Sequence, residues 1–175
     1  MGTGMSLLQS FKPLSNICQH VCGLHCYDGD LQRQLIAHHY CSHLNEDVRQ
    51  CVIYDSHDKA ARLIGVEYII SGRLFAQLPQ EEKKYWHSHV YEVKSGLLVA
   101  PGVPETAEHK EMEKLIGTYG KTWHFWQVDR GDPLPYGPSS LMMALTQDGR
   151  SPYTGIYALL SVCLGCRYDQ SGAVG

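Results

Sequence analysis

The sequence predicts an α+β protein, a single compact domain with a mostly antiparallel sheet and a few helices. Three observations lead to this prediction. A chain of 175 residues is long enough for one sizeable core and short for two. Segments typical of strands and of helices are interleaved without the regular strand–helix–strand repeat of parallel sheets. Apolar residues alternate in the first kind of segment and recur every three or four residues in the second.

Strands are expected where β-branched and aromatic residues gather. Residues 51–54 ("CVIY") read as a buried strand, and a hairpin through residues 55–61 leads to a second strand at 62–71. In that second strand, Ile64, Val66, Tyr68 and Ile70 share one face. Residues 89–100 are also strand-like, and the aromatic segment 121–129 ("KTWHFWQVD") is expected to add another strand before a proline-rich loop at 130–138.

Helices are expected in three places. Between residues 13 and 34, Ile17, Val21 and Leu24 have helical spacing and precede a glycine break at residues 28–30. Pro79 suits the first turn of a short helix. A longer helix should begin at Pro104 and end at Gly117 or at residue 120, another glycine.

Composition narrows the possible functions. The formal charge is −3, and the basic residues are scattered rather than arranged in the stripe that a nucleic-acid backbone requires. The longest apolar run, residues 156–166, is about half of the roughly 20 residues that span a bilayer. We therefore expect no nucleic-acid partner and no transmembrane segment.

The seven cysteines, together with the absence of a signal-peptide pattern, predict an intracellular protein with reduced thiols. Cys18, Cys22 and Cys26 recur every four residues, so on a helix they would share a face. With His25 they could bind zinc. The alternative is that they are small residues lining a buried surface.

Histidine is the unusual part of the composition, with ten residues, and it is concentrated in "HHYCSHLNED" (38–47) and "WHSHVYE" (86–92). In an extended strand, side chains two residues apart point the same way. His39 and His43 therefore share one face of a strand, and His87 and His89 share one face of another. The alternative is that these histidines are structural and bonded to their neighbours.

We predict that the two pairs converge on one pocket that binds a divalent transition metal such as zinc, iron or manganese. The predicted ligands are His39, His43, His87, His89 and Glu92. Glu46 and Asp47 are alternative carboxylates, and His38 is an outer or alternate ligand. His124, flanked by aromatic residues, reads as a core histidine, and His25 as an ordinary one. No G-x-S-x-G elbow, P-loop or G-x-G-x-x-G motif assigns a catalytic activity.

Several long, ordered blocks carry a family resemblance. They are "FKPLSNICQHVCGLHCY", "AHHYCSHLNEDVRQCVIYDS", "ARLIGVEYIIS", "WHSHVYEVKSGLLVAPGVP" and "TYGKTWHFWQVDRGDPLPYGP". They resemble the oil body-associated protein family over residues 11–149, whereas residues 150–175 form a divergent C-terminal tail.

The resemblance implies association with lipid droplets, in the cytoplasm or at the droplet surface, with the surface itself or droplet proteins as partners. It implies no assigned biochemical activity. Attachment could use loops such as the one around residues 133–138. The alternative function is a metal-dependent enzyme or metal-binding protein that uses the histidine-rich pocket, and a plain structural scaffold is a third possibility.

Overall fold

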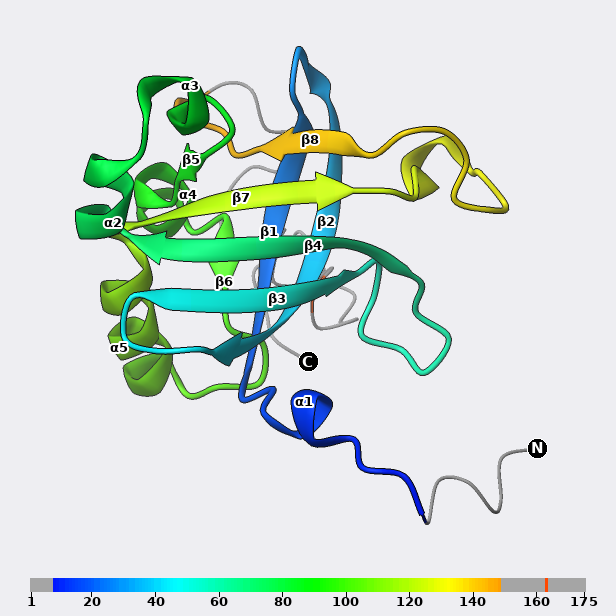
Figure 1. Ribbon diagram of the computed structural model, residues 1–175, viewed down its shortest axis with the longest axis horizontal. Helices are drawn as coiled ribbons and strands as arrows, with labels where there is room; N and C mark the ends of the chain where they lie inside the picture. Colours follow the sequence, from blue (N-terminus) through cyan, green and yellow to red (C-terminus); the bar gives the residue numbers. More distant parts are fainter. Residues whose placement is uncertain (1–7, 149–162, 164–175) are drawn as a thin grey trace, which may run out of the picture.

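Six antiparallel strands close into a barrel in the computed structural model, which describes residues 8–148 and residue 163. The strand order is β2-β3-β4-β7-β8-β1, and pairing of β1 with β2 closes the ring (Figure 1). The six strands are β1 (Gln19–Tyr27), β2 (Asp30–His43), β3 (Val48–Tyr54), β4 (Leu63–Ser71), β7 (Thr118–His124) and β8 (Ser140–Met143).

The segment between β4 and β7 supplies most of the helices and two short strands. β5 (His87–Ser88) pairs with β7, and β6 (Leu98–Val99) pairs with β1. The helices of this segment gather at one end of the barrel (Figure 1). They are α2 (Gly72–Gln77), α3 (Gln80–Lys83), α4 (Val90–Ser95) and α5 (Glu105–Leu115). A short α1 (Lys12–Ser15) precedes β1, and a 3₁₀ turn, η1 (Val128–Arg130), follows β7.

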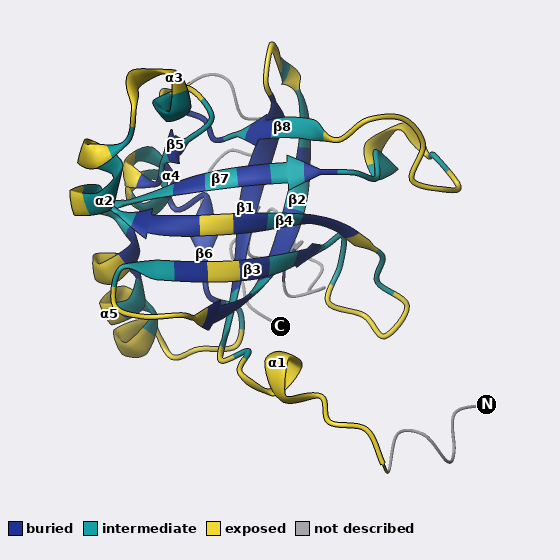
Figure 2. Ribbon diagram, in the orientation of Figure 1, coloured by how far each residue is buried: buried dark blue, intermediate teal, exposed yellow. Residues whose placement is uncertain are grey.

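The barrel interior has three layers. The layer nearest α5 is apolar and includes Val21, Cys41 and Ile69 together with Leu115. The layer at the opposite end is also apolar and is built around Tyr27, Ala37, Ile53 and Met142. Along β2, the buried residue between Ala37 and Cys41 on the same face is His39, so a polar layer lies between two apolar ones. Buried positions alternate with accessible ones along β3, and in the middle of β4 the buried Glu67 lies between the more accessible Val66 and Tyr68 (Figure 2).

The sheet-dominated single domain agrees with the predicted α+β class, and the strands expected at 51–54 and 62–71 are confirmed as β3 and β4. The helix expected between residues 13 and 34 is wrong beyond α1, because residues 19–27 form β1 and pair with β2, β6 and β8. A four-residue spacing keeps side chains on one face in a strand as well as in a helix, so the cysteine pattern did not discriminate between them.

Residues 89–100 were expected to form a strand, but the first half is helix α4. Gly96 ends this helix with a left-handed φ of 71°, and its N–H bonds back to the carbonyls of Glu92 and Val93. Such a glycine is a typical helix end. It turns the chain so that Leu98 and Val99 can pair with β1.

Disulfides correct the expectation of reduced thiols. Cys41 on β2 bonds to Cys51, its direct partner on β3, and Cys22 on β1 bonds to Cys163. The thiols therefore do not support an intracellular location. Residues 18, 22 and 26 are also too far apart to share one ion, since four residues of strand span about 13 Å.

Candidate functional site

Six buried side chains meet in the polar layer of the barrel, and we call them the buried cluster. Four come from inward positions of the barrel strands and two from the segment that covers one end. They are His25 on β1, His39 on β2, Glu67 on β4, His124 on β7, His87 on β5 and His89 at the start of α4. None exceeds 6% exposure. Such burial is costly for polar groups unless each finds a partner.

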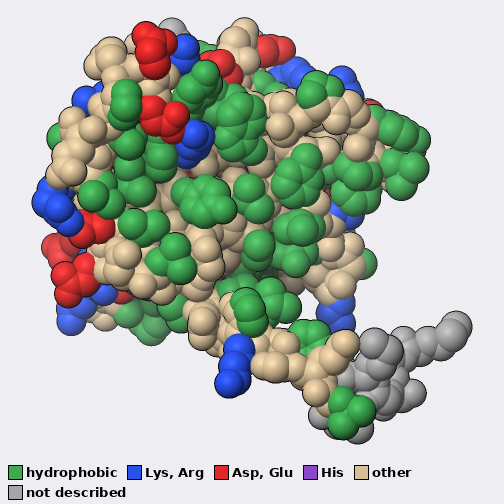
Figure 3. All heavy atoms as spheres, in the orientation of Figure 1, with side chains coloured by type: hydrophobic (Ala, Val, Ile, Leu, Met, Phe, Trp, Pro, Cys, Tyr) green, Lys and Arg blue, Asp and Glu red, His purple; other side chains and the backbone are tan. Residues whose placement is uncertain are grey.

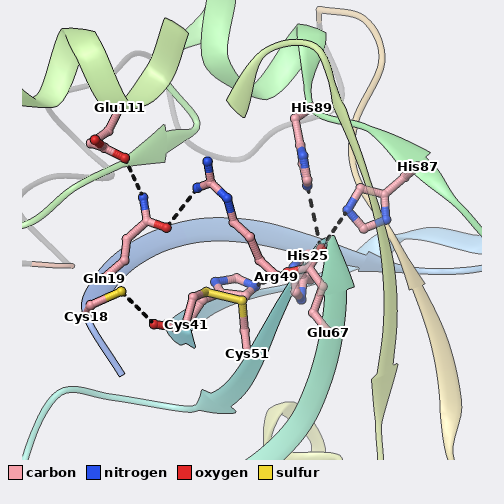
Figure 4. Close-up of a disulfide and its surroundings, with 11 residues drawn as sticks. Cys18, Gln19, His25, Cys41, Arg49, Cys51, Glu67, His87, His89 and Glu111 are labelled. Atoms are coloured by element: carbon pink, nitrogen blue, oxygen red, sulfur yellow. Dashed lines mark hydrogen bonds and ion pairs between the residues drawn. A yellow bond between two sulfur atoms is a disulfide. The ribbon is translucent and has the colours of Figure 1, made fainter. Parts of the chain in front are cut away.

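Glu67 is the centre of the cluster. Its Oε2 lies 3.1 Å from Nε2 of His39, and its Oε1 lies 3.4 Å from Nε2 of His87 and 3.5 Å from Nε2 of His89. Figure 4 shows His87 and His89 reaching Glu67 from the side opposite the Cys41–Cys51 disulfide. One carboxylate thus contacts three imidazoles from two separate parts of the chain, His39 on β2 and the pair His87 and His89.

A second set of contacts extends the cluster across the barrel. Nε2 of His25 lies 3.1 Å from Nε2 of His39, and Nδ1 of His25 lies 3.1 Å from Nε2 of His124. The side-chain donor atoms of His25, His39 and Glu67 all lie within 4.8 Å of one another, as do those of Glu67, His87 and His89. Either triad is compact enough to bind one metal ion.

His89 is held in place from behind. Its Nδ1 lies 2.8 Å from Oγ1 of Thr118, and that hydroxyl donates to the carbonyl of Leu115 at 2.6 Å. The oxygen of Thr118 therefore accepts the Nδ1 hydrogen of His89. This fixes the tautomer of the ring and points Nε2 into the cluster.

Two glycines leave room for the cluster. A Cβ at Gly120 on β7 would lie 2.0 Å from Oε1 of Glu67 and 2.8 Å from Nε2 of His87. A Cβ at Gly65 on β4 would lie 2.6 Å from Cδ2 of His124. Any larger residue at either inward position would occupy the space that the cluster fills.

The electrostatics favour neutral rings at His25 and His124 and an ionised carboxylate at Glu67. Burial lowers the pKa of His25 well below its ordinary value, and nearby His39 and His124 add to the effect. Burial likewise lowers the pKa of His124 to about 3. Burial raises the pKa of Glu67, but its interactions with His39, His87 and His89 outweigh burial and hold that pKa well below the ordinary value.

Glu92 adjoins the cluster from α4. Together with Leu98, Leu115 and the histidines around Glu67, it lines a small internal cavity of about 10 Å³. Burial and the proximity of Glu67 raise the pKa of Glu92 well above its ordinary value. Its Oε2 is buried and has no hydrogen-bond partner within residues 8–148 and 163.

The structure brings together three of the five predicted ligands, His39, His87 and His89, and places Glu92 at the same cavity. It does not bring His43 there, because His43 is exposed at the end of β2, about 13 Å along the strand from His39. His38 points to the other side of β2, where its Nδ1 lies 3.1 Å from Nε2 of His20.

Sequence reasoning missed Glu67, His25 and His124. Glu67 interrupts a β-rich segment, and the apolar residues beside it at 66 and 68 suggested that it faced solvent. Two glycines, at position 65 on the same strand and at position 120 on β7, could have indicated that Glu67 is buried. Glycine within a strand often marks a site where another group approaches closely.

Fold and site together define a small closed β-barrel protein with a histidine–glutamate cluster inside the barrel. The chain belongs to the family whose model is described as "Protein of unknown function (DUF1264)", which matches residues 11–158. The predicted resemblance is confirmed by relatives that are named oil body-associated proteins.

Named relatives are similar over most of this chain. It is 55% identical to oil body-associated protein 1B of Arabidopsis thaliana over 85% of its length, covering 61% of that relative. It is 55% identical to oil body-associated protein 1A of Zea mays, covering 85% of this chain and 62% of the relative. The chain thus spans about three-fifths of these relatives. No solved structure matches it.

Proposed function

We propose that this chain associates with lipid droplets and contacts the droplet through an apolar surface on the outside of the barrel. The observation that carries the proposal is a continuous band of apolar side chains facing outward from four neighbouring strands. The names of the relatives, which are oil body-associated proteins, support a lipid droplet as the partner in this proposal. No helix within the described residues is long and apolar enough to cross a membrane.

The band follows the register of the strands. Tyr40 on β2 lies opposite Val52 on β3, Val52 lies opposite Val66 on β4, and Val66 lies opposite Trp123 on β7. Residues that face each other across an antiparallel sheet project from the same side. These four side chains are all partly accessible, so together they make an apolar row across the outside of the barrel.

Further apolar residues widen this row into what we call the outer apolar face. Tyr68 is 50% exposed and Leu63 is 40% exposed. The members are Leu14, Ile17, Tyr40, Val52, Tyr54, Leu63, Val66, Tyr68 and Trp123. Figure 3 shows hydrophobic side chains gathered over the middle of this side of the molecule, with charged side chains mainly toward its margins.

The segment that contains α1 adds to this face. Leu14 is 59% exposed and, with Ile17, borders a groove of about 420 Å³ against Tyr40, Tyr54 and Leu63. Neighbouring Phe11 is 52% exposed. Large contiguous apolar patches on a folded protein are typical of an interaction surface. A neutral-lipid surface is an occupant that removes such a patch from water without requiring a matching pocket.

The test is flotation of the purified protein with artificial droplets of triacylglycerol coated by a phospholipid monolayer. The unsubstituted protein should float with the droplets. The triple variant Leu14→Glu, Leu63→Glu, Tyr68→Glu should stay in the aqueous layer, because these positions are exposed and charge there opposes contact with lipid.

A matched control places three charges at exposed apolar positions elsewhere, in the variant Val103→Glu, Leu134→Glu, Tyr136→Glu. It should still float, and it also probes the proline-rich loop as an attachment route. Equal flotation of the two triple variants would show that the outer apolar face does not make the contact with the droplet. Failure of the unsubstituted protein to float would reject droplet contact altogether.

A further inference from the structure

Some close polar contacts in the buried cluster lack a hydrogen atom that could make them hydrogen bonds. Nδ1 of His89 carries a hydrogen and donates it in a hydrogen bond to Thr118. A neutral His89 therefore has its lone pair on Nε2. That lone pair faces Oε1 of Glu67 at 3.5 Å. A carboxylate oxygen also offers only lone pairs, so two acceptors face each other inside the barrel. A positive charge between them would turn repulsion into attraction.

The same conflict occurs at His39. Its Nε2 lies 3.1 Å from both Oε2 of Glu67 and Nε2 of His25. A ring nitrogen of neutral imidazole carries either one hydrogen or one lone pair, so it cannot serve both contacts fully. Oε1 of Glu67 and Nε2 of His87 are also buried without a hydrogen-bond partner in the described part of the chain.

The spacing of the donor atoms suits a metal ion. Bonds of about 2.0–2.1 Å from nitrogen or oxygen to zinc, in tetrahedral geometry, place neighbouring donors about 3.3 Å apart. The ring nitrogens of His87 and His89 lie 3.4 and 3.5 Å from the same oxygen, Oε1 of Glu67. The adjoining cavity of about 10 Å³ has room for a single small species.

We propose that one divalent transition-metal ion binds inside the barrel, coordinated by Glu67, His87 and His89, whose donor atoms all lie within 4.8 Å of one another, while His39 contacts the other oxygen of Glu67. Two imidazoles and one carboxylate suit zinc, iron or manganese. Thr118 orients His89 from behind, as hydrogen-bond acceptors commonly do for metal-binding histidines. His25 and Glu92 lie beside the ion. This site is inside the barrel, and it is independent of the outer apolar face.

The first experiment uses the full chain without a histidine tag, stripped with a chelator and titrated with Co²⁺ alone. Co²⁺ reports nitrogen and oxygen coordination through its visible absorption. Near-stoichiometric uptake and a higher melting temperature with Zn²⁺ are expected, because an ion that binds only the folded state stabilises it. Substoichiometric uptake, or a melting temperature indifferent to Zn²⁺, Fe²⁺ and Mn²⁺, would overturn the proposal.

The second experiment assigns the ligands. Glu67→Gln keeps the size of the side chain and removes its charge, so Co²⁺ uptake should be lost, as it should in His87→Ala. The matched control is His43→Ala, an exposed histidine of the same strand as His39, which should bind like the unsubstituted chain. Full binding by folded Glu67→Gln, or loss of binding in His43→Ala, would contradict the assignment.

Thr118→Val tests the positioning of His89 without touching the proposed ligands. Loss of the hydroxyl should weaken Co²⁺ binding roughly 10- to 100-fold while the stoichiometry stays the same. An unchanged affinity would remove Thr118 from the site. Should Glu67→Gln fail to fold, the titration of the unsubstituted chain and of the folded Thr118→Val variant decides the proposal.

Discussion

Gly120 on β7 lies against the carboxylate of Glu67 on β4, so closely that a Cβ at position 120 would be 2.0 Å from Oε1 of Glu67. The carboxylate of Glu67 therefore occupies the space that a side chain at position 120 would need. A larger residue at position 120 would collide with Glu67, because both positions belong to the inward face of the barrel where the polar layer lies.

Gly120→Ala should destabilise the protein by about 1–3 kcal/mol, the usual cost of forcing a methyl group into a packed interior. The measurement is the free energy of unfolding in denaturant. Gly117→Ala is the control, because a Cβ at position 117 meets no atom within 4 Å, and it should change stability by less than about 0.5 kcal/mol. Equal stability of the two variants would mean that the cluster yields to the methyl group.

Asp129 joins η1 to the barrel and gives a pH-dependent prediction. It accepts a hydrogen bond from the hydroxyl of Tyr27 at 2.6 Å and two from Arg33, at 2.6 and 3.0 Å. Asp129→Asn should therefore cost about 1.5–3 kcal/mol at pH 7, as expected for hydrogen bonds to a charged group. Asp132→Asn, which disturbs only a more exposed pair with Arg130, is the control.

The pH dependence of this loss follows from the pKa of Asp129. Burial raises that pKa, but the hydrogen bonds from Tyr27 and Arg33 outweigh it and hold the pKa below the ordinary value of 3.8. A lowered pKa in the folded state stabilises the protein above the unfolded value and stops doing so as the pH falls through the folded value. The difference between the unsubstituted protein and Asp129→Asn should thus be full at pH 7 and shrink below about pH 4. A difference that grew on acidification would contradict this account.

The Cys41–Cys51 disulfide ties β2 to β3 beside the cluster. Replacing both cysteines with alanine should lower the free energy of unfolding by about 2–3 kcal/mol, as expected for a short closed loop. Reductant should lower the melting temperature of the unsubstituted protein more than that of this double variant. Cys18→Ala removes an exposed free thiol and is the control. Equal sensitivity of the three proteins to reductant would show that this bridge does not contribute.

Much of the fold could be predicted from local patterns, but which face of the sheet is buried could not. Val66 and Tyr68 alternate with Glu67, and the usual rule would bury the apolar residues and expose the acid. The barrel reverses this rule at β4, where Tyr68 is 50% exposed and Glu67 only 3%. The same orientation of β4 therefore places Glu67 in the polar layer and Val66 and Tyr68 on the outer apolar face.

The candidate site was predicted in part because histidine content is visible in any sequence. His87 and His89 were paired by strand parity, yet His89 lies at the start of α4, and the two converge because β5 and α4 sit over the same end of the barrel. His25 and His124 could not be assigned, because their contact depends on β8 pairing with both β1 and β7 in the closed barrel. No local pattern encodes that closure.

Closure of the barrel also has a kinetic consequence. The contact between His25 and His124 joins positions 99 residues apart, and chains dominated by such distant contacts fold slowly, because a long loop must close before the contact forms. The histidines gather around Glu67 only after β4, β7 and β1 have found their places. The cluster should therefore be among the last parts of the molecule to assemble, and the partly folded chain exposes its aromatic strands until that point.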